Sequence, residues 1–396
     1  MTPTPDPQLV VDAIVDVRHP IKMQVADWAR ESLDPGDMIE RDLNCTFFRE
    51  AWAACAEVGL PGSVVPSEFG GGSDDVVTTT LKLEGLGMGC RDNGLSFALA
   101  SQMLSFQDAL VKFGSADQRT HILGPACRGE LIGAFAITEP GSGSDSYSMA
   151  TRAERTAGGW KITGEKVHIT LAPVADVAIV FAVTDPSRGR WGISAFVVHA
   201  GRSGVEFTET KPKQGLRTTP FGDIRLDGYV ASDEDLLGVE GSGASIFTAC
   251  MESERGLIMA SHLGAAERTL QDAIARANSR EQFGRPSGHF QAVSQRLVDM
   301  AMHHETARLL LYRAAAEIGL GRRSTLAAAM AKLGASEAIA SLTLAAARVH
   351  GAEGYVTDYE VERDVRDALG GLVYSGTSDI QKNVIAALIG VRTEKS

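Results

Sequence analysis

Two glutamates lie beside an arginine in the run Met251 to Arg255 (Met-Glu-Ser-Glu-Arg), just before an apolar helical stripe. A carboxylate held in a dry pocket acquires a raised pKa and can then remove a proton from carbon. Glu254, directly before Arg255, is in a suitable place for that chemistry. The same cluster is also typical of a solvated first helical turn, in which acidic side chains interact favourably with the helix dipole. On these residues alone, both interpretations stay open.

A turn rich in glycine and hydroxyl groups follows an apolar strand at Phe135 to Asp145 (Phe-Ala-Ile-Thr-Glu-Pro-Gly-Ser-Gly-Ser-Asp). Glycine removes the steric barrier to close approach, so the backbone donors and hydroxyls of such a turn can hold a polar ring or a phosphate. Many strand-turn segments carry glycine and serine without binding a ligand. An ordinary turn is therefore the alternative.

Two further turns follow helices. The first is Arg280-Glu-Gln-Phe-Gly284, with Gln291 shortly after it. The planar fork of an arginine delivers paired, charged hydrogen bonds and suits a pyrophosphate, although an arginine at a helix C-terminus is also an ordinary dipole partner. The second lies in the run Arg348 to Gly354 (Arg-Val-His-Gly-Ala-Glu-Gly), which is equally consistent with a helix that ends at glycine.

The run Val373 to Gln381 (Val-Tyr-Ser-Gly-Thr-Ser-Asp-Ile-Gln) resembles the C-terminal signature of the acyl-CoA dehydrogenase family. That signature, Tyr-Glu-Gly-Thr-Ser-x-x-Gln, carries the catalytic glutamate. Here Ser375 stands in its place, and a serine cannot act as the base without a partner. Some branches of the family carry the base in a Glu-Arg pair at an earlier helix, and Glu254-Arg255 falls on that pair. The resemblance thus implies that Glu254 is the base, whereas Glu252 is out of register and is expected to be structural.

The turns described above are similar to the family's cofactor motifs. The resemblance implies an FAD-dependent dehydrogenase in which the base removes the α-proton of an acyl thioester and the flavin accepts a hydride from the β-carbon. The expected FAD contacts from the chain's own side are Thr138, Ser144, His168, Thr170 and Thr377. Those expected to reach the cofactor across a subunit interface are Arg280, Phe283, Gln291, Gly351 and Gly354. The residues expected to contact the substrate are Arg255, Tyr374 and Ser375.

Two residues depart from the family pattern in these motifs. His168, in the run Lys166 to Thr170, replaces an aromatic residue, often Trp, that packs against the flavin. An imidazole is smaller and can titrate, and a strand histidine with an ordinary hydrogen bond is the alternative. Ala352 replaces the second glycine of the family's Gly-Gly-x-Gly turn. Contacts across subunits imply at least a dimer and, as in most of the family, a tetramer.

The substrate is indicated by the Ser-Gly-Thr-Ser-Asp variant of the signature and by the segments Gly89–Gly94 and Ala172–Asp176. They are similar to family members from antibiotic and siderophore-type pathways, which oxidise acyl or aminoacyl groups, such as prolyl, tethered to a carrier protein. A CoA thioester is the alternative. The electron acceptor is either an electron-transfer flavoprotein or oxygen. Two other functions stay open: a flavin-dependent monooxygenase on the same scaffold and a non-catalytic assembly protein that kept the fold.

Hydrophobic periodicity predicts the elements that must position these residues. Residues 1–130 are expected to be helical, residues 131–238 to form short antiparallel strands, and residues 239–396 to be helical again. The expected fold class is α+β, mostly helical. The order matches the acyl-CoA dehydrogenase fold, with an N-terminal helical domain, a middle β-barrel-like domain and a C-terminal four-helix bundle.

Composition excludes several other classes of protein. The net charge of -12 over 396 residues argues against nucleic-acid binding, which needs a basic face. The five cysteines show no CxxC spacing, so neither a metal site nor a disulfide framework is expected. No apolar run reaches the ~18 residues of a membrane span, and the N-terminus does not read as a secretory signal. We therefore expect a cytoplasmic protein with buried free thiols.

Overall fold

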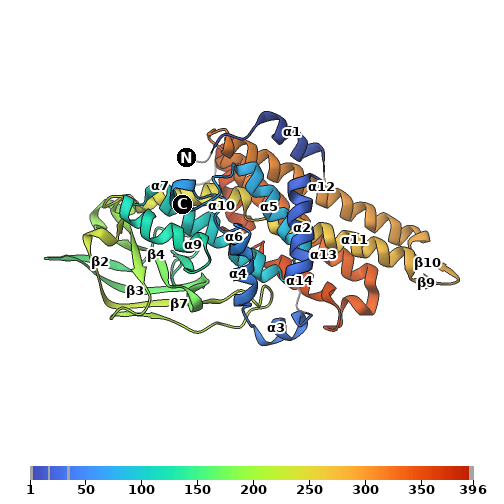
Figure 1. Ribbon diagram of the computed structural model, residues 1–396, viewed down its shortest axis with the longest axis horizontal. Coiled ribbons are helices and arrows are strands. Elements are labelled where there is room, and N and C mark those ends of the chain that lie inside the picture. The colour runs from blue at the N-terminus through green and yellow to red at the C-terminus, as the bar shows by residue number, and fades with distance from the viewer. Residues whose placement is uncertain (1–2, 17, 34–35, 392–396) are drawn as a thin grey trace.

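The computed structural model describes residues 3–16, 18–33 and 36–391. A β-sheet occupies one end of the molecule, and long helices extend from it to the other end (Figure 1). Helices come first in the chain, strands follow, and helices complete it. This arrangement confirms the expected fold class, α+β and mostly helical.

The N-terminal part of the chain packs around α5, a helix that is buried on nearly all sides. Asp75 caps it by accepting hydrogen bonds from the backbone nitrogens of Val77 and Thr78 at 2.8 and 3.0 Å. Glycine lets a neighbouring helix approach, because a Cβ at Gly87 would lie 1.7 Å from the carbonyl oxygen of Ser261. The helices are α1 Pro7–Val15, α2 Pro20–Ser32, α3 Met38–Asn44, α4 Arg49–Glu57, α5 Val76–Gly89, α6 Asn93–Ser101, α7 Asp108–Phe113, α8 Ala116–Gln118 and α9 Gly124–Cys127.

A π-helical turn, Gln102–Gln107, joins α6 to α7 in one continuous helical rod. Such turns are rare and occur frequently at functional sites. The side-chain carbonyl of Gln102 accepts a hydrogen bond from the backbone nitrogen of Gly133 at 2.8 Å. This bond ties the π-helical turn to the first strand of the sheet.

The middle strands form one sheet in the order β6-β7-β3-β2-β4-β5-β8, and β1 pairs with β4. The sheet is mainly antiparallel, as expected, but β1 runs parallel to β4 and β2 meets β4 in parallel at one residue. The connection from β1 to β4 is long enough to contain β2 and β3, so the chain can cross over and return in the same direction. The strands are β1 Gly133–Ala136, β2 Arg152–Thr156, β3 Gly159–Thr170, β4 Val177–Val183, β5 Ile193–His199, β6 Val205–Phe207, β7 Phe221–Ala231 and β8 Leu236–Leu237.

The pairing of β3 with β7 is interrupted by a bulge. The register shifts between Lys166 and Ile169, and His168 within the bulge has a φ of 61°. A bulge bends the strand and redirects a side chain that would otherwise follow the sheet's alternation. His168 lines the cavity described below.

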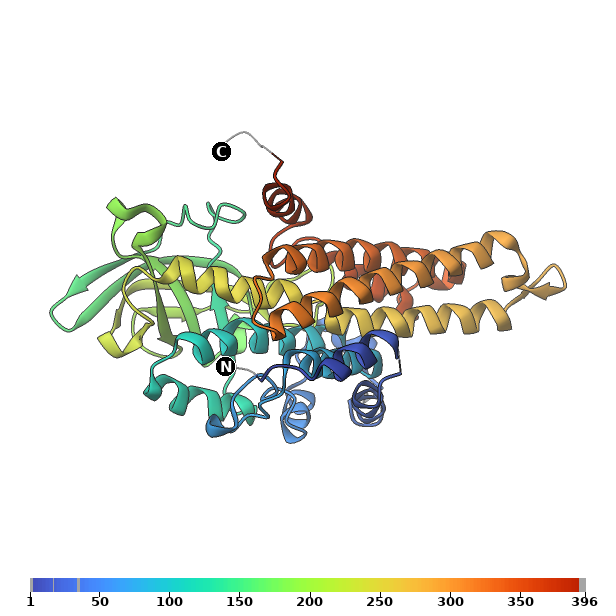
Figure 2. The same cartoon turned by 90° about the horizontal axis from the view of Figure 1, so that it is seen from above.

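The C-terminal helices α10 to α13 pack against one another as the expected four-helix bundle. Figure 2 shows α11, α12 and α13 side by side, extending away from the sheet to the β9–β10 hairpin. The elements are α10 Gly243–Leu257, α11 Ala260–Ser279, β9 Glu281–Gln282, β10 Arg285–Pro286, α12 Gln291–Gly319, α13 Thr325–His350, α14 Glu360–Gly370 and α15 Ser378–Leu388.

A buried ion network ties the N-terminal helices to the bundle. The ammonium of Lys22 on α2 bonds to Glu84 on α5 at 2.8 Å and also to Glu267 on α11. Tyr312 on α12 donates its hydroxyl to Glu84. Each buried carboxylate therefore has a charged partner, which offsets the large cost of removing it from water. Glu84, Glu267 and His304 lie close enough together to hold a metal ion, but the ammonium of Lys22 already bridges the two carboxylates.

The five cysteines are free thiols, and all but Cys45 are buried. Among the described residues, no helix combines the length and the apolar character needed to cross a membrane.

Candidate active site

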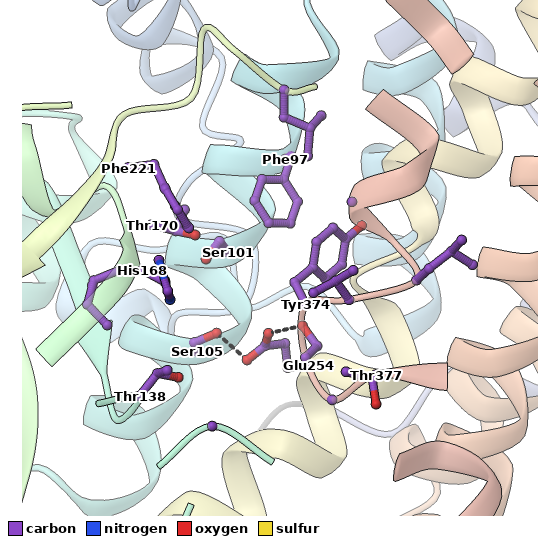
Figure 3. Close-up of a pocket in the computed structure, with 18 of the residues that line it drawn as sticks. Phe97, Ser101, Ser105, Thr138, His168, Thr170, Phe221, Glu254, Tyr374 and Thr377 are labelled. Carbon is purple, nitrogen blue, oxygen red and sulfur yellow. Dashed lines mark hydrogen bonds between the residues drawn. The ribbon is translucent and has the colours of Figure 1, made fainter. Parts of the chain in front are cut away.

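A cavity of about 870 Å³ lies where the sheet, the α6–α7 rod and the helical bundle meet. Its wall includes the ends of β1 and β3, the loop around Lys213, the last turns of α10 and the segment from Leu369 to Thr377. Figure 3 shows side chains from distant parts of the chain, among them Ser105, His168 and Glu254, pointing toward one space. Residues far apart in the sequence therefore form a single site.

Glu254 lies in the last turns of α10, and only 8% of the residue is exposed. The interpretation of this cluster as a solvated first helical turn is therefore wrong. Ser105 donates its hydroxyl to Oε2 of Glu254 at 2.6 Å, and Ser375 donates its hydroxyl to Oε1 (Figure 3). Glu252 points elsewhere: its carboxylate accepts hydrogen bonds from the backbone nitrogen and the hydroxyl of Ser324, at 2.7 and 2.6 Å. This contact supports the expectation that Glu252 is structural.

Burial raises the pKa of the Glu254 carboxyl above its ordinary value. The hydrogen bonds from Ser105 and Ser375 and the charges of Arg255 and Lys332 act in the opposite direction without cancelling the effect. No cationic side chain in the described part of the chain forms an ion pair with this carboxylate. The group combines a raised pKa with hydrogen bonds that favour its ionised form, which suits a general base.

Ser375 occupies a strained backbone position beside Glu254. Its φ is 55°, and the following Gly376 has a φ of 88°. The carbonyl oxygen of Ser375 accepts hydrogen bonds from Nε of Arg255 and Nε2 of Gln381, both at 3.2 Å. Left-handed conformations of non-glycine residues persist where the surroundings fix them, and here two side chains do so.

Two aromatic rings close one side of the cavity. The rings of Phe97 and Tyr374 lie 4.5 Å apart between centroids. The hydroxyl of Tyr374 lies 3.3 Å from both Nε2 of His262 and Sδ of Met259, so its polar end already has partners in the protein. Burial lowers the pKa of His262 to about 4, which keeps the imidazole neutral. This part of the wall is suited to a small apolar group.

Hydroxyl groups line the side of the cavity nearest the sheet. Thr138, Ser144 and Thr170 all face it, and within the described residues their hydroxyls have no hydrogen-bond partner. The ring of His168 stacks on Phe221, with centroids 5.8 Å apart and an angle of 15° between the planes. Unpartnered hydroxyls beside flat rings fit a polar, planar cofactor. Thr377 is also in the wall, where it caps α15 by accepting a hydrogen bond from the backbone nitrogen of Ile380 at 3.2 Å.

Comparison with known proteins identifies this arrangement. The acyl-CoA dehydrogenase N-terminal, middle and C-terminal domain models match residues 18–130, 134–229 and 241–390. The chain belongs to the acyl-CoA dehydrogenase family. As a member of that family it is an FAD-dependent oxidoreductase that acts on CH–CH bonds and dehydrogenates thioester substrates.

The chain is similar to family members whose names or structures refer to prolyl groups or to proline. An L-prolyl peptidyl-carrier-protein dehydrogenase of Pseudomonas fluorescens is 37% identical over 86% of this chain and 90% of that protein. The structure of the prolyl acyl carrier protein oxidase AnaB matches with a TM-score of 0.92 and 37% identity, over 97% of this chain and 99% of the other. The structure of PigA with FAD and proline matches with a TM-score of 0.91 and 34% identity, over 94% and 97% of the two chains.

The remaining residues of the acyl-CoA dehydrogenase motifs do not line this chain's cavity. Phe283 is 93% exposed at the β9–β10 hairpin, the end of the bundle farthest from the sheet (Figure 2). An ion pair of 2.7 Å between Arg276 and Glu353 links the end of α11 to the turn Gly351–Gly354. The motif residues placed at or near this end, outside the cavity wall, are Arg280, Phe283, Gln291, Gly351 and Gly354.

Motif comparison missed three residues of the site. Ser105, Phe97 and Lys332 lie outside the family motifs considered above, although each is buried at or beside the cavity. Lys332 could have been suspected from the sequence, because it lies in an alanine-rich helix and a lysine is rarely fully buried unless it has a partner. Its ammonium donates to the carbonyl of Gly371 at 2.6 Å.

Proposed function

We propose that Glu254 removes the α-proton of a small aminoacyl thioester, such as prolyl, tethered to a carrier protein. The observation that carries this proposal is the buried carboxylate in the cavity wall, which is held by two hydroxyls and has no ion-pair partner among the described residues. Burial raises the pKa of this carboxyl, so its ionised form is a stronger base than an exposed carboxylate and suits proton removal from carbon.

In the proposed mechanism, bound FAD supplies the hydride acceptor, and the protein supplies position and proton transfer. Thr138, Ser144, His168 and Thr170 form the wall against which the flavin is expected to lie. The substrate fits between that wall and Glu254. Its acyl group packs on the rings of Phe97 and Tyr374, and the bound substrate then covers the carboxylate, which is already largely shielded from water. The α-proton then moves to an oxygen of Glu254.

Two observations support a carrier-protein aminoacyl substrate. The relatives and structures compared above act on prolyl groups or contain proline. The cavity is bounded by two aromatic rings, which leaves a compact apolar space suited to a small ring. The second candidate is a CoA thioester, which the family as a whole favours.

The mass of the product distinguishes these substrates. The FAD-loaded protein is incubated with a panel of thioesters that includes prolyl and other aminoacyl groups on a carrier protein, and butyryl and longer acyl groups on CoA. We expect loss of 2 Da, or a multiple of it, from the prolyl carrier-protein thioester. Oxidation of the CoA thioesters alone would reject the carrier-protein proposal and keep the dehydrogenase.

The cofactor site is proposed to be completed by a second copy of the chain. The Arg280 turn and the Gly351–Gly354 turn lie away from this chain's cavity, which is consistent with contacts to a neighbouring subunit's FAD in a dimer or tetramer. The electron acceptor is proposed to be either an electron-transfer flavoprotein or oxygen. Oxygen consumption during turnover, compared with reduction of an artificial dye under anaerobic conditions, separates the two.

A further inference from the structure

Ser105 and Ser375 reach the same carboxylate from elements that are 270 positions apart by residue number. Ser105 lies in the π-helical turn, is 2% exposed, and donates to Oε2 of Glu254 at 2.6 Å. Ser375 donates to Oε1 from the strained turn before α15. Each oxygen of the carboxylate therefore has its own hydroxyl donor.

We propose that Ser105 is a positioning residue for the dehydrogenation: with Ser375, its hydroxyl holds the Glu254 carboxylate in one orientation. The inference rests on the proposed role of Glu254 as the base. A carboxylate has about four lone-pair sites. Two of them are taken by the hydroxyls, and the others stay available to receive the α-proton.

The two hydroxyls are themselves held in place independently. The π-helical turn that carries Ser105 is tied to β1 through the bond from Gly133 to Gln102. The turn that carries Ser375 is tied to α10 through Arg255 and to α15 through Gln381. Rotation of the carboxylate would break a hydrogen bond on each side, so the catalytic geometry is fixed before the substrate enters.

The other titratable groups around Glu254 do not replace these hydroxyls. The charges of Arg255 on α10 and Lys332 on α13 lower the pKa of Glu254, but neither side chain bonds to its carboxylate. Both donate their hydrogen bonds to backbone carbonyls instead. Tyr374 and Cys250 have pKa values raised by burial and by the charge of Glu254, and so stay neutral. Removing the Ser105 hydroxyl thus removes a donor to the ionised carboxylate that no neighbour restores, and the pKa of Glu254 rises.

The test is the pH dependence of flavin reduction in the FAD-loaded protein, measured by anaerobic stopped flow. The probe is the L-prolyl thioester of a carrier protein, or butyryl-CoA if the substrate panel selects CoA. Ser105→Ala should move the acid limb of the profile to higher pH by about one unit, since a hydrogen bond to a charged group is worth roughly that much. Ser105→Thr keeps the hydroxyl and should return the midpoint toward that of the parent.

A matched control comes from the same helical rod. Ser96 is also buried, but its hydroxyl donates to the backbone carbonyl of Asp92 at 3.2 Å, and Ser96 does not line the cavity. Ser96→Ala should keep the parent midpoint. A second readout needs no turnover: infrared difference titration of the substrate-free protein, with Glu254→Gln as the blank, should show the same upward shift of the carboxyl pKa in Ser105→Ala.

The outcomes separate the two proposals. If Glu254→Gln slows flavin reduction but Ser105→Ala keeps the parent midpoint in both measurements, the positioning role is wrong and the base assignment stands. If Glu254→Gln reduces its flavin as fast as the parent, the base assignment is wrong, and the positioning role that rests on it is wrong as well. Should Ser105→Ala not fold or retain FAD, Ser105→Cys gives the same comparison, because a thiol is a weak donor.

Discussion

Nε of Arg255 donates to the backbone carbonyl of Ser375 at 3.2 Å, although the oppositely charged Glu254 is its neighbour in the chain. The guanidinium therefore fixes the turn that carries the Ser375 hydroxyl and does not neutralise the carboxylate. That hydroxyl in turn bonds to Glu254. In the Glu-Arg pair, Glu254 thus supplies the carboxylate, and Arg255 holds in place the turn whose hydroxyl bonds to that carboxylate.

Arg255→Lys should slow flavin reduction about 10-fold or more, because an ammonium on a flexible stem does not reproduce the fixed direction of Nε. Lysine keeps the positive charge, so a purely electrostatic role for Arg255 predicts almost no change. Stopped-flow flavin reduction measures the effect. Arg225→Lys, at an exposed arginine on β7, is the control and should behave as the parent.

Glu254→Gln should keep the bound FAD and slow flavin reduction by ~10²–10⁴-fold, the usual loss when a positioned base is removed. Adding Ser375→Glu to this variant should recover part of the rate, because the side chains of residues 254 and 375 meet within hydrogen-bond distance. Stopped-flow comparison of the single and double variants is the measurement. A double variant no faster than Glu254→Gln would show that a carboxylate at position 375 does not reach the α-carbon.

Glu254→Gln should also change stability in a pH-dependent way. Burial raises the folded-state pKa of Glu254 above its unfolded value. A group of this kind contributes stability below its unfolded pKa and loses that contribution as the pH rises through the folded pKa. The amide does not titrate, so the gain in Tm of Glu254→Gln over the parent should be larger at pH 8 than at pH 5. An equal difference at both pH values would mean that the carboxyl pKa is not raised.

The order of helices and strands could be predicted because periodicity is local. The parallel pairing of β1 with β4 could not, since it depends on how the chain returns after β2 and β3. The sequence does not indicate β2 either, because Arg-Ala-Glu-Arg-Thr is too polar to predict a strand, and β2 forms because β3 pairs with it along its whole length.

The residues of the site likewise divide into those that the sequence predicts and those that it does not. Motifs indicated Glu254 and the hydroxyls near the sheet, because those residues keep a fixed spacing in the chain. Ser105 could not be found, since it is 149 residues from its partner. Sequence reasoning alone predicts that Ser375→Ala changes the rate little, because a serine has no base role. The hydrogen bond from Ser375 to Glu254 argues against that expectation.

Phe97→Ala should widen the range of acyl groups that the protein accepts. Its ring packs against that of Tyr374 at one side of the cavity, so its removal leaves room for several methylene groups. We expect kcat/KM for hexanoyl relative to butyryl thioesters to rise, together with a loss of stability of roughly 3 kcal/mol, as for other large-to-small changes in a packed wall. An unchanged ratio in a variant of lowered Tm would show that Phe97 supports the fold without bounding the substrate.

Arg280→Ala should lower FAD occupancy in the purified oligomer while leaving the fold intact. Arg280 ends α11 beside the β9–β10 hairpin, outside this chain's own cavity, so its guanidinium is expected to act on a neighbouring subunit's cofactor. Arg285→Ala is the matched control, because Arg285 lies in the same hairpin and packs 4.2 Å from the centre of the Phe290 ring. The ratio of visible to ultraviolet absorbance gives FAD per chain, and light scattering gives the mass. A parent protein that is monomeric and still binds FAD stoichiometrically would contradict the shared site, as would equal loss of FAD from both variants.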